Sequence, residues 1–211
     1  MPYYVNRQAS VPQKIYQVYF LFFTGIGVYL LGAYTLSSYG FSLFASITSF
    51  AALLWMVTSQ NIISFYVFSF TTGISHHSLF AYISWIDDNI ITEALCLTFL
   101  IFAGLAVIAF LSPTYSSFAF NGFLYTFFGG IFWLSVLNIF YQNNFLDLLL
   151  TYASIICFSL FVIIDIRGIT SNNNHGPVYH AGQLLIDFIG IFIDFVKLLK
   201  HGRIKNRTNS N

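Results

Sequence analysis

Charged residues are what this sequence has least of. Only 7% of its 211 residues are Asp, Glu, Lys or Arg, whereas about a quarter of an ordinary soluble domain is charged. Hydrophobic residues make up 57% of the chain, which excludes a water-soluble globule. Because one helical crossing of a bilayer takes about 20 residues, the chain has room for six or seven crossings and for no separate soluble domain.

Cysteines and catalytic motifs are also scarce. Cys96 and Cys157 lie alone in apolar runs without Cys-x-x-Cys spacing, so neither a disulfide framework nor a cysteine metal site is predicted. The sequence contains no His-Glu-x-x-His and no Gly-x-Ser-x-Gly motif, which argues against metalloprotease and serine hydrolase chemistry. The formal net charge of +1 gives no field that would attract nucleic acid. We therefore expect neither an enzyme nor a cofactor-binding or nucleic-acid-binding protein.

Long apolar runs separated by short polar links predict seven helical segments. They lie near residues 15–37, 41–58, 62–85, 90–111, 118–141, 145–167 and 182–200. Such short links make sequential helices pack as antiparallel hairpins. The sequence thus predicts an all-α, multi-pass integral membrane protein with six to seven transmembrane helices. Its expected parts are a polar tail at 1–14, one transmembrane domain at 15–201 and a basic polar tail at 202–211.

The last apolar segment is the most polar of the seven. It carries Asp187, Asp194 and Lys197 and is barely long enough to cross a membrane. Seven full crossings would divide the basic residues 3:5 between the two sides, whereas a last segment that re-enters or crosses halfway would gather them on one side. The positive-inside rule favours the second arrangement, with both termini in the cytosol.

Carboxylates within apolar segments are costly and mark functional candidates. Asp165 lies near the end of the sixth segment and Asp187 lies in the seventh, so a hairpin between these segments can bring the two to one depth. Two carboxylates in a low-dielectric site tend to share one proton, and their oxygens also suit Ca²⁺, which needs six to eight ligands. The pair is therefore a candidate proton sensor and a transient Ca²⁺ site. In the alternative interpretation, Asp165 reaches the interface beside Arg167 and Asp187 is a protonated packing residue.

Other polar residues have structural interpretations beside functional ones. Asp194 can pair with Lys197 three residues later, and Glu93 can stabilise a helix N-terminus, although both are also candidates for an ion pathway. His76 and His77 are adjacent and so point in different directions on a helix, which favours a structural role over metal binding and leaves a pH-responsive role as the alternative.

A membrane aspartyl protease would also place two aspartates in separate spans. Such enzymes are expected to show Tyr-Asp and Gly-x-Gly-Asp settings, but here Ile164 precedes Asp165 and Ile186 precedes Asp187. The protease interpretation is therefore disfavoured.

From about Trp55 to the C-terminus, the sequence resembles the Bax inhibitor family, particularly its bacterial pH-sensitive calcium-leak members. The resemblance depends on the order and spacing of several short stretches. These are residues 70–75, Glu93-Ala94 with 98–103, 138–140, 158–165, 185–189 and the basic ending 197–200.

The resemblance implies two three-helix layers around a central C-terminal helix. It implies a pH-regulated calcium leak channel or Ca²⁺/H⁺ exchanger in which Asp165 and Asp187 form the di-aspartyl proton sensor. Ca²⁺ would be the transported ion, and the partners would be the lipid bilayer, Ca²⁺ and H⁺. The membrane would be the cytoplasmic membrane in a bacterium, or an endomembrane for a eukaryotic or viral protein. The alternative is a non-conducting protein that modulates a membrane protease or a cell-death pathway by binding a membrane protein.

The sequence departs from the calcium-leak members after the second segment. Those members carry a basic cluster there, including an arginine that contacts the first aspartate when closed, but residues 57–61 hold no basic residue. Gln60 is expected to hydrogen-bond a protonated Asp165 instead, although it cannot neutralise an ionised one. His76 and His77 stand near the place of a Gly-Pro found in many relatives, and they are an alternative source of pH response.

Overall fold

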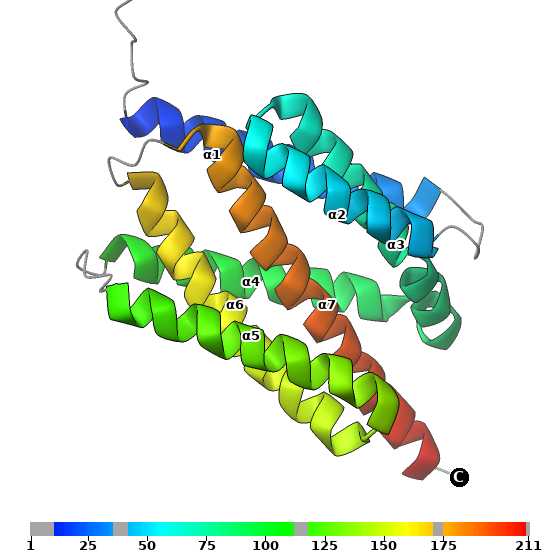
Figure 1. Cartoon of the computed structure of the whole chain (residues 1–211). Helices are drawn as coiled ribbons and strands as arrows, with labels where there is room; N and C mark the ends of the chain where they lie inside the picture. Colours follow the sequence, from blue (N-terminus) through cyan, green and yellow to red (C-terminus); the bar gives the residue numbers. More distant parts are fainter. Residues whose placement is uncertain (1–10, 36–41, 112–117, 171–174, 210–211) are drawn as a thin grey trace, which may run out of the picture.

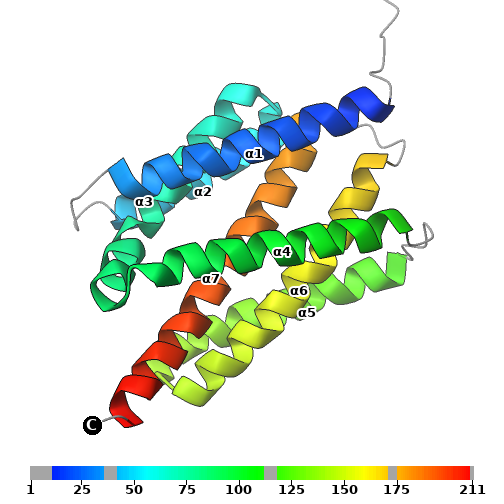
Figure 2. The same cartoon turned by 180° about the vertical axis from the view of Figure 1, so that it is seen from behind.

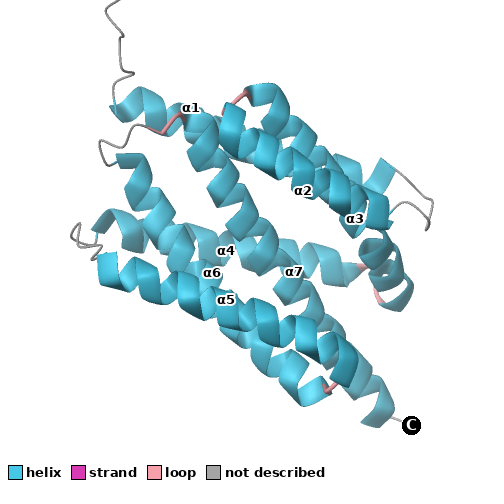
Figure 3. Ribbon diagram, viewed as in Figure 1, coloured by secondary structure: helices cyan, strands magenta, loops and turns pink. Residues whose placement is uncertain are grey.

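The computed structural model describes residues 11–35, 42–111, 118–170 and 175–209, and these residues form seven helices and no strand (Figure 3). The helices are α1 (Val11–Thr35), α2 (Ser42–Ser59), α3 (Ile62–Ile86), α4 (Asn89–Leu111), α5 (Phe118–Tyr141), α6 (Asn144–Thr170) and α7 (Pro177–Asn209). The all-α prediction is confirmed, and each predicted segment corresponds to one helix.

The predicted division into two tails and one transmembrane domain stays a prediction, whereas the structure gives the first and last residues of the helices. Helix α1 begins at Val11, three residues earlier than the edge of the predicted tail, because Pro12 is tolerated in the first turn, where no backbone N–H is needed. Helix α7 continues to Asn209. The first ten residues of the predicted N-terminal tail lie outside the described residues.

Helix α7 runs between two groups of helices (Figures 1 and 2). Helices α1, α2 and α3 pack together on one side of it, and α4, α5 and α6 lie on the other. Helix α7 itself contacts α1, α2, α3, α4 and α6. With 33 residues it is about 50 Å long and unbroken, so the last segment does not turn back on itself. The side of the membrane on which the C-terminal end of α7 lies stays a prediction.

The core of the molecule is centred on α7. Its buried side chains include Leu184, Leu185, Phe188 and Phe192. Phe188 makes edge-on or tilted ring contacts with Phe22 of α1 and with aromatic rings of α4, so apolar contacts reach α7 from both helix groups. Protein therefore surrounds the helix that carries the acidic residues.

The outer surface is apolar, as expected for contact with lipid. Exposed aromatic side chains include Phe44, Trp133 and Phe140. Within the part of the chain that the structure describes, four helical stretches are long and apolar enough to cross a membrane, namely Val11–Thr35, Asn89–Leu111, Gly122–Tyr141 and Asn144–Thr170. These features indicate a multi-pass membrane protein.

Helices α1 and α3 cross with their backbones in direct contact. Gly32 of α1 lies against the carbonyl of Phe70, and Gly73 of α3 lies against the carbonyl of Tyr29. A Cβ atom at either glycine would overlap the facing carbonyl oxygen. Small residues at such crossings allow close packing between membrane helices.

Candidate functional site

Asp165 and Asp187 face each other across the contact between α6 and α7. Asp165 lies five residues before the end of α6, and Asp187 lies in the third turn of α7. Their carboxyl groups are close enough to interact directly, and Oδ2 of Asp187 is buried without a hydrogen-bond partner among the described residues. Asp187 is only 5% exposed. The two aspartates that the sequence singles out therefore form one pair, in which Asp187 is buried and Asp165 is half-buried.

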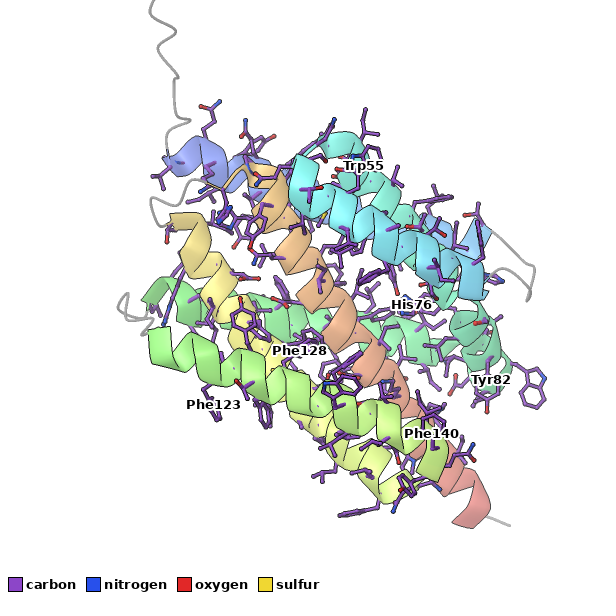
Figure 4. The ribbon with its side chains drawn as sticks, in the orientation of Figure 1. Trp55, His76, Tyr82, Phe123, Phe128 and Phe140 are labelled. Atoms are coloured by element: carbon purple, nitrogen blue, oxygen red, sulfur yellow. The ribbon has the colours of Figure 1, made fainter. Side chains whose placement is uncertain are left out.

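The pair lines a cavity of about 220 Å³ between α5, α6 and α7. Its other walls are mainly aromatic, and Phe128 points from α5 toward α6 whereas Phe123 points away from the bundle (Figure 4). The lining residues besides the aspartates are Tyr125, Phe128, Phe158, Phe161, Gln183 and Ile186. Two ionised carboxylates would repel each other strongly in such surroundings, so the site favours either one shared proton or one bound cation.

The ligand set of this cavity is incomplete for a tightly bound metal. Ca²⁺ takes six to eight oxygen ligands, and the two aspartates supply only part of them. Among the described residues, no group of three or more His, Cys, Asp or Glu side chains is placed to hold a metal ion. The arrangement therefore suits brief cation contact in competition with a proton.

Gln60 lies at the turn between α2 and α3, where it adopts a positive φ of 48°. Its side-chain oxygen accepts a hydrogen bond from the backbone N–H of Gly176 at 3.0 Å. Gln60 thus ties the α2–α3 turn to the segment before α7, and its oxygen is engaged there instead of facing Asp165. The expected hydrogen bond from Gln60 to Asp165 is not formed in this structure.

His76 and His77 both contact α1. The Nδ1 atom of His76 lies 3.3 Å from the Tyr29 hydroxyl, and that of His77 lies 2.6 Å from the backbone carbonyl of Ala33. Figure 4 shows His76 within the group of helices α1 to α3. Neither histidine lines the Asp165–Asp187 cavity. The contacts favour the structural interpretation, in which the histidines hold α3 against α1.

The two remaining acidic candidates make ion pairs. Asp194 accepts a hydrogen bond from the Lys197 ammonium at 3.2 Å. Glu93 at the start of α4 pairs with Arg203 of α7 at 2.8 Å, and Arg203 also lies 3.3 Å from Asp87 at the end of α3. Arg203 follows Asp187 by 16 residues, about 24 Å along α7. Glu93 therefore belongs to a separate cluster that fastens the end of α7 to the α3–α4 turn.

Replacing Arg203 with Gln should remove its ion pairs with Asp87 and Glu93 without disturbing the Asp165–Asp187 pair. The Arg203 side chain is 44% exposed, and exposed ion pairs contribute about 0.2–1 kcal/mol each. We expect thermal unfolding of the purified protein to shift by an amount corresponding to about 1 kcal/mol or less. A loss of stability as large as that from a core substitution would show that these ion pairs contribute more to the free energy of unfolding than their exposure suggests.

The sequence interpretation missed Asp147, which lies in the first turn of α6. It shares a cavity with Asp194, and that cavity also has the lining residues Asn138 and Lys197. The signal was present as a cluster of asparagines at 138, 143 and 144 just before the aspartate. These asparagines belong to a site only because α7 passes beside them, and the sequence does not predict that packing.

Comparison with known proteins shows sequence similarity to one family over most of the chain. The family model described as "Inhibitor of apoptosis-promoting Bax1" matches residues 11–204, nearly the whole chain. A Campylobacter jejuni protein named "Uncharacterized protein Cj0236c" is 28% identical over 143 residues, which cover 66% of this chain and 61% of that protein. "Bax inhibitor 1" of Drosophila melanogaster is 27% identical over 151 residues, covering 69% of this chain and 62% of that protein.

The chain spans about three fifths of the length of these curated relatives. The family model, by contrast, covers all seven helices up to residue 204, including both Asp165 and Asp187. The chain belongs to the Bax inhibitor family.

Proposed function

We propose that this protein is a pH-regulated Ca²⁺ leak pathway in which the Asp165–Asp187 pair is the proton sensor. The observation that carries the proposal is that the two carboxyl groups face each other across the α6–α7 contact and line one mainly aromatic cavity, where they can share one proton. When that proton leaves, two negative charges remain in a mainly apolar cavity and attract a cation. Proton and Ca²⁺ then compete for one site, either in a channel or in a Ca²⁺/H⁺ exchanger.

The proposal includes the arrangement of the helices in the membrane. Six to seven helices would cross the bilayer, with α1–α3 and α4–α6 as two layers around α7. Enclosure of α7 by protein explains how Asp187 and Asp194 are tolerated at membrane depth, because lipid is not their neighbour. The source membrane would be the cytoplasmic membrane in a bacterium or an endomembrane elsewhere. The protein would act without enzyme activity or a resident cofactor.

The test is Ca²⁺ entry into proteoliposomes that contain the purified wild-type chain, measured at about pH 6, 7 and 8. Because a proton competes with the cation for the pair, we expect entry above that of empty liposomes and rising with pH. Entry equal to that of empty liposomes at every pH would overturn the proposal. It would favour the alternative of a non-conducting protein that binds a membrane protease or a cell-death regulator.

A further inference from the structure

A second cavity lies between α5, α6 and α7, on the C-terminal side of the aspartate pair along α7. Its volume is about 380 Å³, and Asp147, Asp194 and Lys197 all line it. A neighbouring cavity of about 270 Å³ shares Asn138 and Asp147 with it and extends to Asn143 at the α5–α6 turn. The two together form a recess, lined by both polar and apolar side chains, that runs from this turn inward to α7.

Asp194 is the innermost acidic group of this recess. Its side chain is 6% exposed, and Oδ1 contacts Lys197. Although Ser154 lies beside the carboxylate, Oδ2 is buried and makes no hydrogen bond of ordinary geometry within the described residues. A buried carboxylate oxygen without a partner is costly, so this atom points to a ligand that is positively charged or donates a hydrogen bond.

The charge of the recess also favours a cation. Asp147 and Asp194 are close enough to repel each other, and Lys197 offsets only one of their two charges. The described residues give Asp147 no ion-pair partner. The helix dipole explains why an acidic residue such as Asp147 lies in the first turn of α6. It does not explain why Asp194 is buried opposite Asp147.

The recess offers oxygen ligands and room for water. The neutral oxygens of Ser135, Asn138 and Thr151 accompany the two carboxylates in the lining. Carboxylate, amide and hydroxyl oxygens suit hard cations such as Ca²⁺. Because one water occupies about 30 Å³ in the liquid, a cavity of this size holds several waters that would complete a coordination shell.

An aromatic ring separates this recess from the Asp165–Asp187 cavity. Asp194 follows Asp187 by seven residues, about 10 Å along α7, and Gly190 lies between them. The Phe158 ring packs so closely on Gly190 that a Cβ atom there would overlap it, and Phe128 stacks edge-on against Phe158. The two acidic sites are therefore distinct.

We infer that the recess at Asp147 and Asp194 binds a divalent cation of the Ca²⁺ type, and that the Lys197 ammonium is its built-in competitor. Lys197 is 43% exposed, so its ammonium can swing outward when a cation enters. The inference rests on the proposed function for the identity of the ion, and on the recess alone for the existence of the site.

The test is equilibrium dialysis of radioactive Ca²⁺ against the full-length protein in detergent, comparing wild type with Lys197→Met. Removing the competing ammonium should tighten Ca²⁺ binding about tenfold, a ratio that dialysis resolves easily. Lys200→Met is the matched control, because Lys200 lies one turn further along α7 and contacts the Tyr82 ring instead of the recess. It should bind Ca²⁺ as the wild type does.

The double variant Lys197→Met with Asp194→Asn tests whether the tighter Ca²⁺ binding occurs at the recess. If the inference holds, the added Asn removes the tighter binding, because the innermost carboxylate is lost. Persistence of the gain in the double variant, or absence of any gain in Lys197→Met, would overturn the inference. If Lys197→Met does not fold because it leaves Asp194 unpaired, Asp147→Asn replaces it and should weaken wild-type Ca²⁺ binding; unchanged binding would again count against the site.

Binding and flux distinguish the two proposals. Ca²⁺ binding that responds to Lys197 and Asp194, without any flux into liposomes, would keep the recess as a cation site and remove the leak function. Ca²⁺ flux into liposomes, combined with Ca²⁺ binding that does not respond to these substitutions, would keep the leak function and remove the recess as a cation site.

Discussion

Asp187→Asn is expected to flatten the pH dependence of Ca²⁺ entry into proteoliposomes. In the proposed mechanism Asp187 and Asp165 share one proton, so competition between that proton and Ca²⁺ can change site occupancy by up to about tenfold per pH unit. An asparagine cannot release a proton, and the remaining carboxylate no longer has a charged neighbour across the α6–α7 contact. We expect entry to differ by less than about twofold between pH 6 and 8. Asp165→Asn should act in the same direction.

Asp88→Asn is the matched control for loss of one carboxylate. Asp88 is exposed at the turn between α3 and α4, outside both acidic cavities. Its variant should keep the pH response of the wild type. A steep pH response that survives in both Asp165→Asn and Asp187→Asn would move the sensor elsewhere, and His76 with its Tyr29 contact would then be the first residue to replace.

The helices and the aspartate pair could be predicted from the sequence because each depends on local pattern. Apolar runs of about 20 residues determine where helices form in a membrane protein, and short links make neighbours antiparallel. Helices α6 and α7 are such neighbours, so Asp165 and Asp187 were expected at one level. The structure brings them together through the contact between these two helices.

Contacts between helices far apart in sequence could not be predicted in the same way. Gln60 and Gly176 are 116 residues apart, and Glu93 and Arg203 are 110 apart. Their pairing depends on how α7 passes between the two helix groups, which the hydrophobic pattern leaves open. For the same reason Asp194 was interpreted through Lys197, its neighbour in sequence, and the opposing Asp147 was missed.

The crossing of α1 and α3 predicts the largest loss of stability from a small substitution. In Gly73→Ala, the added Cβ atom meets the carbonyl oxygen of Tyr29 and lies 2.9 Å from the backbone nitrogen of Ala33, and backbone atoms cannot turn aside as a flexible side chain can. The helices must separate, which also weakens the His76–Tyr29 and His77–Ala33 contacts. Overpacking of this kind costs about 1–3 kcal/mol.

Thermal unfolding in detergent, followed by tryptophan fluorescence, measures this loss against Gly104→Ala. A Cβ atom at Gly104 of α4 meets nothing within 4 Å, so this control changes only helix propensity, which favours Ala by about 1 kcal/mol. We therefore expect the two Gly→Ala variants to shift the unfolding temperature in opposite directions. Equal shifts would mean that α1 and α3 do not meet at Gly73. Because α7 packs against both helices, the same loosening should also reach the contact that positions Asp187, and Gly73→Ala should make Ca²⁺ entry less dependent on pH.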